Sequence, residues 1–132
     1  MKKEGCLTKA RALRADASAH YNCAQAAIIA LRPEDGPDEA DCVRMGAFFG
    51  SGMRCGSVCG AVTGALMALG LQGAGEKSGQ ELLRRFRDKN GALNCAELLK
   101  AAAQRGEERK SHCDRMVFDA VEMAAEIMEG EA

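Results

Sequence analysis

Residues that favour helices far outnumber residues that favour strands in this sequence. The chain has 24 alanines and 11 leucines, whereas valine, isoleucine and threonine together supply only 10 of its 132 residues. Alanine and leucine are strong helix formers, and β-branched residues are enriched in sheets. A chain of this length suits one domain with one core. We therefore predict an all-α, single-domain bundle over residues 1–132.

Periodic apolar residues and helix-breaking residues predict five to six helices. The first is an amphipathic stretch from about Leu7 to Leu31, with a candidate break near Asn22. Pro37 is typical of a first helical position, and Gly91 of the residue that follows a helix. The remaining helices are predicted at residues 37–48 and 57–69, from around 82 to near 91, and at 95–103 and 112–128.

The longest uncharged stretch of the chain runs from Cys55 to Gly75. Its length would suffice for a membrane-spanning helix, and three of its glycines have GxxxG spacing. Glycines and polar residues interrupt its apolar character, however, and its last residues are typical of a loop. We therefore predict a buried central helix at residues 57–69 and a protein that is not embedded in a membrane.

Charge and aromatic content argue against a nucleic-acid-binding protein. The chain has 18 basic and 19 acidic residues, a formal net charge of -1, one tyrosine, four phenylalanines and no tryptophan. Nucleic-acid binding would favour a basic face and stacking aromatic residues. The first residues carry charges throughout, so we expect no secretory signal and a location in the reducing cytoplasm. Permanent structural disulfides are the exception in that compartment.

Seven cysteines are many for a domain of this size, and an odd number cannot all pair within one chain. Four of them follow residues that commonly cap helices: asparagine directly precedes Cys23 and Cys95, and serine stands two residues before Cys59 and Cys113. The positive end of a helix dipole stabilises a thiolate, so we expect these thiols to lose their protons readily. Thiolates attack disulfides and bind metals. In the alternative interpretation, the cysteines are small buried apolar residues.

Two of these segments form a near-repeat, Asn22-Cys23-Ala24-Gln25 and Asn94-Cys95-Ala96-Glu97. In each, the asparagine can cap a helix, and the Gln or Glu three residues later can accept a hydrogen bond from the backbone N–H of the cap residue. The near-repeat therefore predicts two capping boxes, each with a cysteine directly after the cap.

Five segments carry a characteristic combination of motifs: Asn22-Cys23-Ala24-Gln25-Ala26, Gly50-Ser51-Gly52-Met53, Cys59-Gly60-Ala61-Val62-Thr63-Gly64-Ala65, Asn94-Cys95-Ala96-Glu97-Leu98-Leu99, and Cys113 with Val117. Together they resemble the C-GCAxxG-C-C family of redox-active proteins, over about residues 21–125. That family is defined by four cysteines, the second of which lies inside a CGAxxG motif. The resemblance implies that the four are Cys23, Cys59, Cys95 and Cys113.

The resemblance also implies a redox role, as an oxidoreductase or an electron-transfer protein with a redox partner protein. A related domain occurs in split-Soret cytochromes, which contain an iron–sulfur centre in addition to haem. We therefore expect the four cysteines to hold an iron–sulfur cluster. The chain has no CxxCH motif, and covalent haem is not implied. Cys6, Cys42 and Cys55 lie outside the set of four, and we expect no chemical role for Cys6, which is close to the terminus.

Three alternatives stay open. The first is metal-free thiol–disulfide exchange, in which Cys59 attacks a partner and Cys55, four residues earlier, resolves the mixed disulfide. The second is a structural zinc site of the four cysteines, with His20 or His112 replacing one of them in a variant of that hypothesis. The third is a helical adaptor or one half of a homodimer, whose cysteines have no chemical role.

Overall fold

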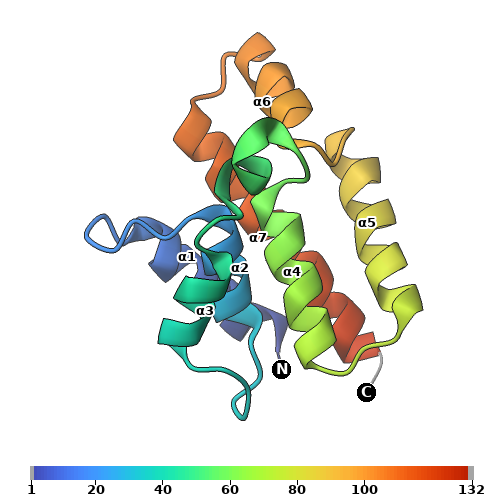
Figure 1. Cartoon of the computed structure of the whole chain (residues 1–132). Helices are drawn as coiled ribbons and strands as arrows, with labels where there is room; N and C mark the ends of the chain where they lie inside the picture. The colour runs from blue at the N-terminus through green and yellow to red at the C-terminus, as the bar shows by residue number, and fades with distance from the viewer. Residues whose placement is uncertain (1, 131–132) are drawn as a thin grey trace.

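The computed structural model describes residues 2–130. Within that range the chain consists of helices and loops, and no β-strand is formed (Figure 1). The prediction of an all-α fold is confirmed. The described residues form eight helical elements rather than five to six: α1 (Lys3–Ala15), α2 (Cys23–Leu31), α3 (Glu39–Gly46), η1 (Gly52–Gly56), α4 (Gly60–Leu71), α5 (Glu76–Asn90), α6 (Cys95–Gln104) and α7 (Arg109–Gly130).

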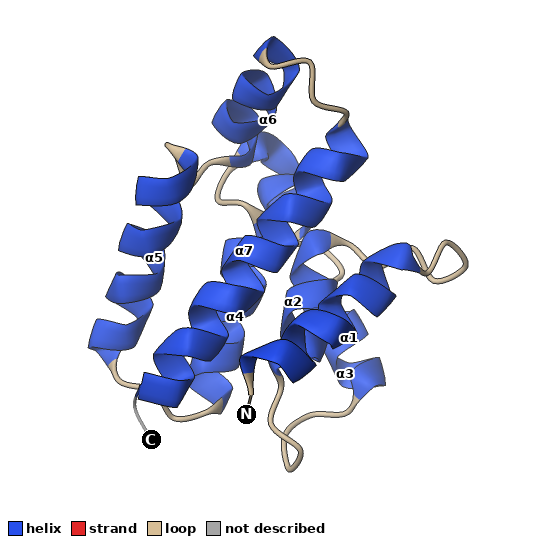
Figure 2. Ribbon diagram, turned by 180° about the vertical axis from the view of Figure 1, so that it is seen from behind, coloured by secondary structure: helices blue, strands red, loops and turns tan. Residues whose placement is uncertain are grey.

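Helices α2, α4 and α7 form the centre of the bundle. Each of the three packs against the other two, and their buried residues make up most of the main core. Helix α1 covers α2 and α7 on one flank, α3 packs against α2, and α5 lies along α4 and α7 on the other flank (Figures 1 and 2). Helix α6 caps one end of the bundle, next to η1 and the first turns of α7. In the described part of the chain, no helix has the length and apolar composition needed to cross a bilayer.

The amphipathic stretch from Leu7 to Leu31 is two helices, and the candidate break near Asn22 is confirmed. The break is longer than expected, because a turn begins at Asp16. The carboxylate of Asp16 accepts hydrogen bonds from the backbone N–H groups of Ser18 and Ala19 and from the Ser18 hydroxyl. Such a local turn competes with helix continuation. His20 then adopts a left-handed conformation with φ of 52°, and α2 begins at Cys23.

The first residues of α2 also hold the end of α3. Asn22 and Gln25 form the predicted capping box, with the Asn22 Oδ1 accepting from the Gln25 backbone N–H at 2.8 Å. The Asn22 Nδ2 donates to the carbonyl of Gly46, and the Gln25 Nε2 donates to the carbonyl of Val43. Carbonyl groups at a helix C-terminus have no partner within their own helix. The cap of α2 thus satisfies the end of α3 and fixes the backbone beside Cys23.

The second predicted capping box does not form. The Asn94 side chain makes no capping hydrogen bond to α6. The backbone around Asn94 instead pairs with the segment around Val58 in an isolated antiparallel bridge. This tertiary pairing explains why two nearly identical sequences start their helices differently.

The two asparagines therefore differ in the stability they provide. We expect Asn22→Ala to lower the free energy of unfolding by about 1–2 kcal/mol, because it leaves the N-terminal end of α2 and the Gly46 carbonyl without side-chain partners. Asn94→Ala is the matched control and should change that free energy by less than about 0.5 kcal/mol. Urea denaturation followed by circular dichroism measures both changes. Equal losses in the two variants would contradict this assignment of the cap.

Candidate functional site

Four cysteines from four separate segments line one cavity at the α6 end of the bundle. Cys23 is the first residue of α2, Cys59 directly precedes α4, Cys95 is the first residue of α6, and Cys113 lies in α7. The cavity has a volume of about 130 Å³. The fold thus brings together the four cysteines that the resemblance implied, although they are far apart in the sequence. We call this space the cysteine cavity.

The isolated bridge holds two of the cysteines next to each other. The backbone N–H of Cys59 donates to the Leu93 carbonyl at 2.8 Å, and the N–H of Cys95 donates to the Ser57 carbonyl at 2.7 Å. Each cysteine directly follows one residue of the Val58–Asn94 bridge. Ser57 was predicted to cap the central helix. Its carbonyl instead accepts the hydrogen bond from Cys95, and the N-cap residue of α4 is Cys59.

The glycines of the CGAxxG motif bring Cys59 close to Cys23. A Cβ atom on Gly60 would lie 2.8 Å from the Phe49 carbonyl oxygen and 3.4 Å from the Cys23 Cβ. A Cβ on Gly64 would lie 2.5 Å from the carbonyl oxygen of Ala24, in the first turn of α2. Distances under 3.0 Å are not tolerated without movement of the backbone. The motif therefore allows α4 to pack directly on α2, where the first cysteine is held.

Cys113 is not at a helix start, contrary to the prediction. Helix α7 begins at Arg109 rather than at His112, so Cys113 lies one turn inside it. Lys110, which lies between the helices predicted at 95–103 and 112–128, donates through its Nζ to both carboxylate oxygens of Asp114. Such an i,i+4 pair supports a helix. The early start places Arg109 one turn before Cys113, where both residues line the cysteine cavity.

A left-handed turn closes one side of the cysteine cavity. Four consecutive residues, Ser51 to Arg54, have φ between 53° and 61°. Left-handed conformations cost a non-glycine residue about 1–2 kcal/mol, so the glycines at 50, 52 and 56 favour a turn here but do not by themselves indicate a run of four such residues. Ser51 lines the cavity, and its Oγ accepts a hydrogen bond from the Arg109 Nη2 at 3.2 Å.

The four thiols have different acidities. The thiol of Cys23 is hydrogen-bonded to Cys113, which raises the pKa of Cys23 well above its usual range and lowers the pKa of Cys113 to about 6. The positive charges of Arg14 and Arg109 also lower the pKa of Cys113. Burial raises the pKa of Cys59 to about 11 and raises the pKa of Cys95. The expectation that all four are acidified at helix starts is wrong for three of them, because the interaction with Cys113 raises the pKa of Cys23 and burial raises the pKa of Cys59 and Cys95.

Two arginines of the site were not found by sequence reasoning. Arg14 is nearly buried, with its Nε 2.6 Å from the Asp114 Oδ1 and its Nη1 donating to the Tyr21 carbonyl. Arg14 belongs to α1 and is about 100 residues before Cys113 in the sequence. No local sequence pattern could therefore place it in the site. Arg109 stands four residues before Cys113, and this helical spacing is the signal that could have revealed it.

The other predicted candidates lie outside the cysteine cavity, except His112. Cys42 is buried with Ile28 and Ile29 between α2 and α3. Cys55 is exposed, with its Sγ 3.6 Å from the Gly52 carbonyl oxygen. Cys6 is 1% exposed and part of the main core, so it is a packing residue of α1.

His20 is exposed in the turn after α1, whereas His112 is buried and lines the cavity. All seven cysteines are free thiols.

A family model described as "Putative redox-active protein (C_GCAxxG_C_C)" matches residues 21–127. The chain belongs to the C_GCAxxG_C_C family. The resemblance noted from the motifs is confirmed, and the match runs two residues beyond the expected end. Neither a curated protein nor a solved structure matches the chain. The family's name refers to the cysteine pattern, and in this C_GCAxxG_C_C protein those cysteines share one cavity.

Proposed function

We propose that this C_GCAxxG_C_C protein uses Cys23, Cys59, Cys95 and Cys113 to hold an iron–sulfur cluster for electron transfer or redox sensing. The observation that carries the proposal is that these four thiols, from four different segments, line a single cavity. Four cysteine thiolates are a complete ligand set for a cluster of two or four irons. The cluster would supply one-electron redox chemistry, and the chain would supply its ligands, its shielding and its electrostatic surroundings.

The donor set and its surroundings fit such a group. In a cluster of four irons each cysteine binds a different iron, so the sulfurs surround a volume rather than a point. Among residues 2–130, no three His, Cys, Asp or Glu side chains are arranged to hold one metal ion. Arg14 and Arg109 would offset the negative charge of a thiolate-ligated centre, which tunes its potential. Leu98 and Met116 supply apolar walls that limit the access of water.

The composition of the protein tests this proposal directly. Protein purified without oxygen is assayed for iron, acid-labile sulfide and zinc, and its visible spectrum is recorded. We expect iron and sulfide in matching amounts and a broad visible absorption. Zinc alone would support a structural site instead. Metal-free, colourless protein whose thiols form a disulfide reversibly would support thiol–disulfide exchange instead.

A specific contact supports a second candidate, thiol–disulfide exchange between Cys23 and Cys113. The two side chains line the same cavity and are near enough to shift each other's pKa in opposite directions, which gives Cys113 the thiolate character. In this reaction the Cys113 thiolate attacks a disulfide of a partner protein, forms a mixed disulfide and releases one partner thiolate. Cys23 then loses its proton and attacks the Cys113 sulfur, which releases the second thiolate. The protein ends with a Cys23–Cys113 disulfide, and the partner has gained two electrons.

This second candidate differs from the exchange pair predicted from the sequence. The roles of Cys59 as attacking thiol and Cys55 as resolving thiol stay predictions. The high pKa of Cys59 leaves little thiolate near neutral pH, and the thiol of Cys55 bonds to the Gly52 carbonyl outside the cavity. A thiol needs both a thiolate fraction and access to attack a disulfide. The geometry therefore favours Cys113 over Cys59 as the attacking residue.

The thiols of the metal-free protein should react with an alkylating agent in a defined order. Because only a thiolate is alkylated, the rate at Cys113 should rise as the pH increases through about 6 and then level off. Cys59, with a pKa of about 11, should still be slow at pH 8. Mass spectrometry of timed samples gives the rate at each cysteine. Faster alkylation at Cys59 than at Cys113 would contradict this order, and Cys113→Ser provides the assignment control.

The association and location of the protein stay predictions. A homodimer would show twice the chain mass of 14.0 kDa in light scattering. The redox partner protein and the cytoplasmic location are expectations from the sequence and the resemblance.

A further inference from the structure

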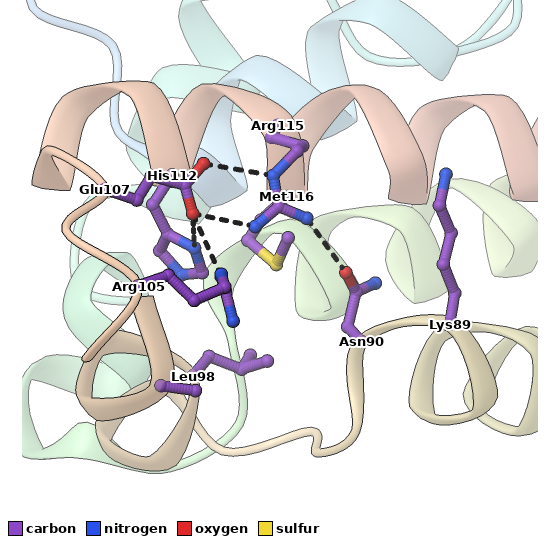
Figure 3. A pocket seen from close by; sticks show the side chains of 9 residues that line it. Lys89, Asn90, Leu98, Arg105, Glu107, His112, Arg115 and Met116 are labelled. Atoms are coloured by element: carbon purple, nitrogen blue, oxygen red, sulfur yellow. Dashed lines mark hydrogen bonds and ion pairs between the residues drawn. The ribbon is translucent and has the colours of Figure 1, made fainter. Parts of the chain in front are cut away.

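A second cavity of about 310 Å³ lies directly beside the cysteine cavity. The two share Leu98, His112 and Met116 as lining residues. Figure 3 shows the second cavity between the end of α5, helix α6 with the loop after it, and the first turns of α7. We call it the α5–α6–α7 cavity. Its volume is at the lower end of the range of small-molecule sites.

Positive charge exceeds negative charge in this cavity by one. The Glu107 carboxylate accepts two hydrogen bonds from Arg115, at 2.9 and 3.1 Å, and one from Arg105 at 2.9 Å. Two guanidinium groups thus face one carboxylate. The third cation, Lys89, is matched by Asp119, which lies 2.9 Å from its Nζ. One unit of positive charge is left to attract an anion.

His112 presents an unpartnered polar atom to the α5–α6–α7 cavity. The side chain is only 3% exposed, and its Nδ1 has no hydrogen-bond partner. The nearest acceptor is the Glu107 Oε1, at 3.6 Å, which is beyond hydrogen-bonding distance. In Figure 3 the ring lies beside Glu107 and Arg105, and the dashed line from the ring to Glu107 marks this 3.6 Å ion-pair contact rather than a hydrogen bond. Buried polar atoms are nearly always satisfied, so this nitrogen indicates a missing partner.

Apart from Asn90, whose Oδ1 accepts a hydrogen bond from the Arg115 Nη1 at 3.3 Å, the remaining lining of the cavity is apolar. Leu98 and Ala101 from α6 and Met116 from α7 contribute to its walls. A ligand that matches this lining has an anionic end for the arginine side and a short apolar body for the other side. An excess of one positive charge matches one carboxylate better than a doubly charged phosphate.

We propose that the α5–α6–α7 cavity binds a small molecule with one carboxylate and a short apolar body, whose carboxylate accepts hydrogen bonds from Arg105 and the His112 Nδ1–H. The bound molecule lies one layer of side chains away from the cysteines, because Leu98, His112 and Met116 line both cavities. The inference is independent of the redox proposal, since it requires neither a metal nor an oxidised thiol.

Calorimetric titration with butyrate tests this site, together with the ring ¹⁵N resonances of His112. Butyrate should bind and shift the His112 Nδ1 resonance, whereas its neutral analogue butyramide should bind about tenfold more weakly or not at all. Arg105→Gln should raise the Kd for butyrate about tenfold. Arg11→Gln removes one positive charge from an exposed position of α1 and should leave the Kd unchanged.

Several outcomes would overturn the inference. They are an absence of butyrate binding, equal affinity for butyrate and butyramide, and equal loss of affinity in the Arg105 and Arg11 variants. Tighter binding of inorganic phosphate than of butyrate would also overturn it, because it would show a general anion site without a role for the apolar wall. The comparison with butyramide uses the unchanged protein, so it remains decisive if Arg105→Gln alters the fold.

Discussion

Cys59→Ser should remove iron, acid-labile sulfide and visible absorption from the purified protein almost completely. Cys59 is 5% exposed and lies between the bridge to α6 and the first turn of α4. A serine hydroxyl is not deprotonated near neutral pH and is a poor ligand for iron, so the cluster would lose one of its four anchors. Metal analysis and the visible spectrum of the variant, relative to wild type, give the size of the loss.

Cys42→Ser is the matched control for this experiment. Cys42 is as buried as Cys59, but it packs against Ile28 and Ile29, away from the cysteine cavity. Both variants place a hydroxyl in a buried position and should lose similar stability, whereas only Cys59→Ser should lose iron. If wild type and both variants were equally colourless and metal-free, and Cys23 and Cys113 formed no disulfide on oxidation, the protein would be better described as a helical adaptor with buried cysteines. If both variants retained iron, the ligand assignment would be wrong.

Gly64→Ala should lower the free energy of unfolding by about 1–3 kcal/mol or more. The added methyl group would meet the Ala24 carbonyl oxygen at 2.5 Å and the Ala27 Cβ at 2.9 Å, so α2 and α4 would have to separate. Thermal denaturation should show a drop of several degrees in Tm, because each kcal/mol shifts Tm by roughly 2–8 °C in domains that bracket this size. The same separation would move Cys59 away from Cys23.

Gly70→Ala, in the same helix, separates the contact from the effect of helix propensity. A Cβ at Gly70 would meet nothing within 4 Å. Alanine favours helix formation more than glycine, so this variant should be neutral or more stable by up to about 1 kcal/mol. Destabilisation of both variants to the same extent would show that the close approach of α2 and α4 is not the reason for the glycine.

Local sequence signals predicted the parts of this structure that depend on local contacts. Asn22 and Gln25 form the capping box that their spacing indicated, and Gly91 directly follows α5 as predicted. The near-repeat at Asn94 wrongly predicted a capping box, because the backbone around Asn94 pairs with the segment around Val58. A distant segment decided that outcome, and a local pattern contains no information about it.

The site shows the same division. The family resemblance singled out the four cysteines that line the cavity, and the CGAxxG motif joins one of them to the glycines that pack its helix. The acidities of three of the four were predicted incorrectly, since burial and the interaction between Cys23 and Cys113 depend on tertiary structure. Arg14 reaches the site from α1 and pairs with Asp114 in α7, which could be known only from the folded chain.

The last of the four cysteines lies in the last helix. Cys113 belongs to α7, and α7 contacts α1, α2, α4, α5 and α6. During synthesis the chain emerges from its N-terminus, so α7 reaches the bundle after the helices that carry Cys23, Cys59 and Cys95. Any group that needs all four thiols must therefore be inserted once α7 is present, into a bundle that has already folded or is completing its fold. Truncation of α7 would remove one thiol and also the scaffold that aligns the other three.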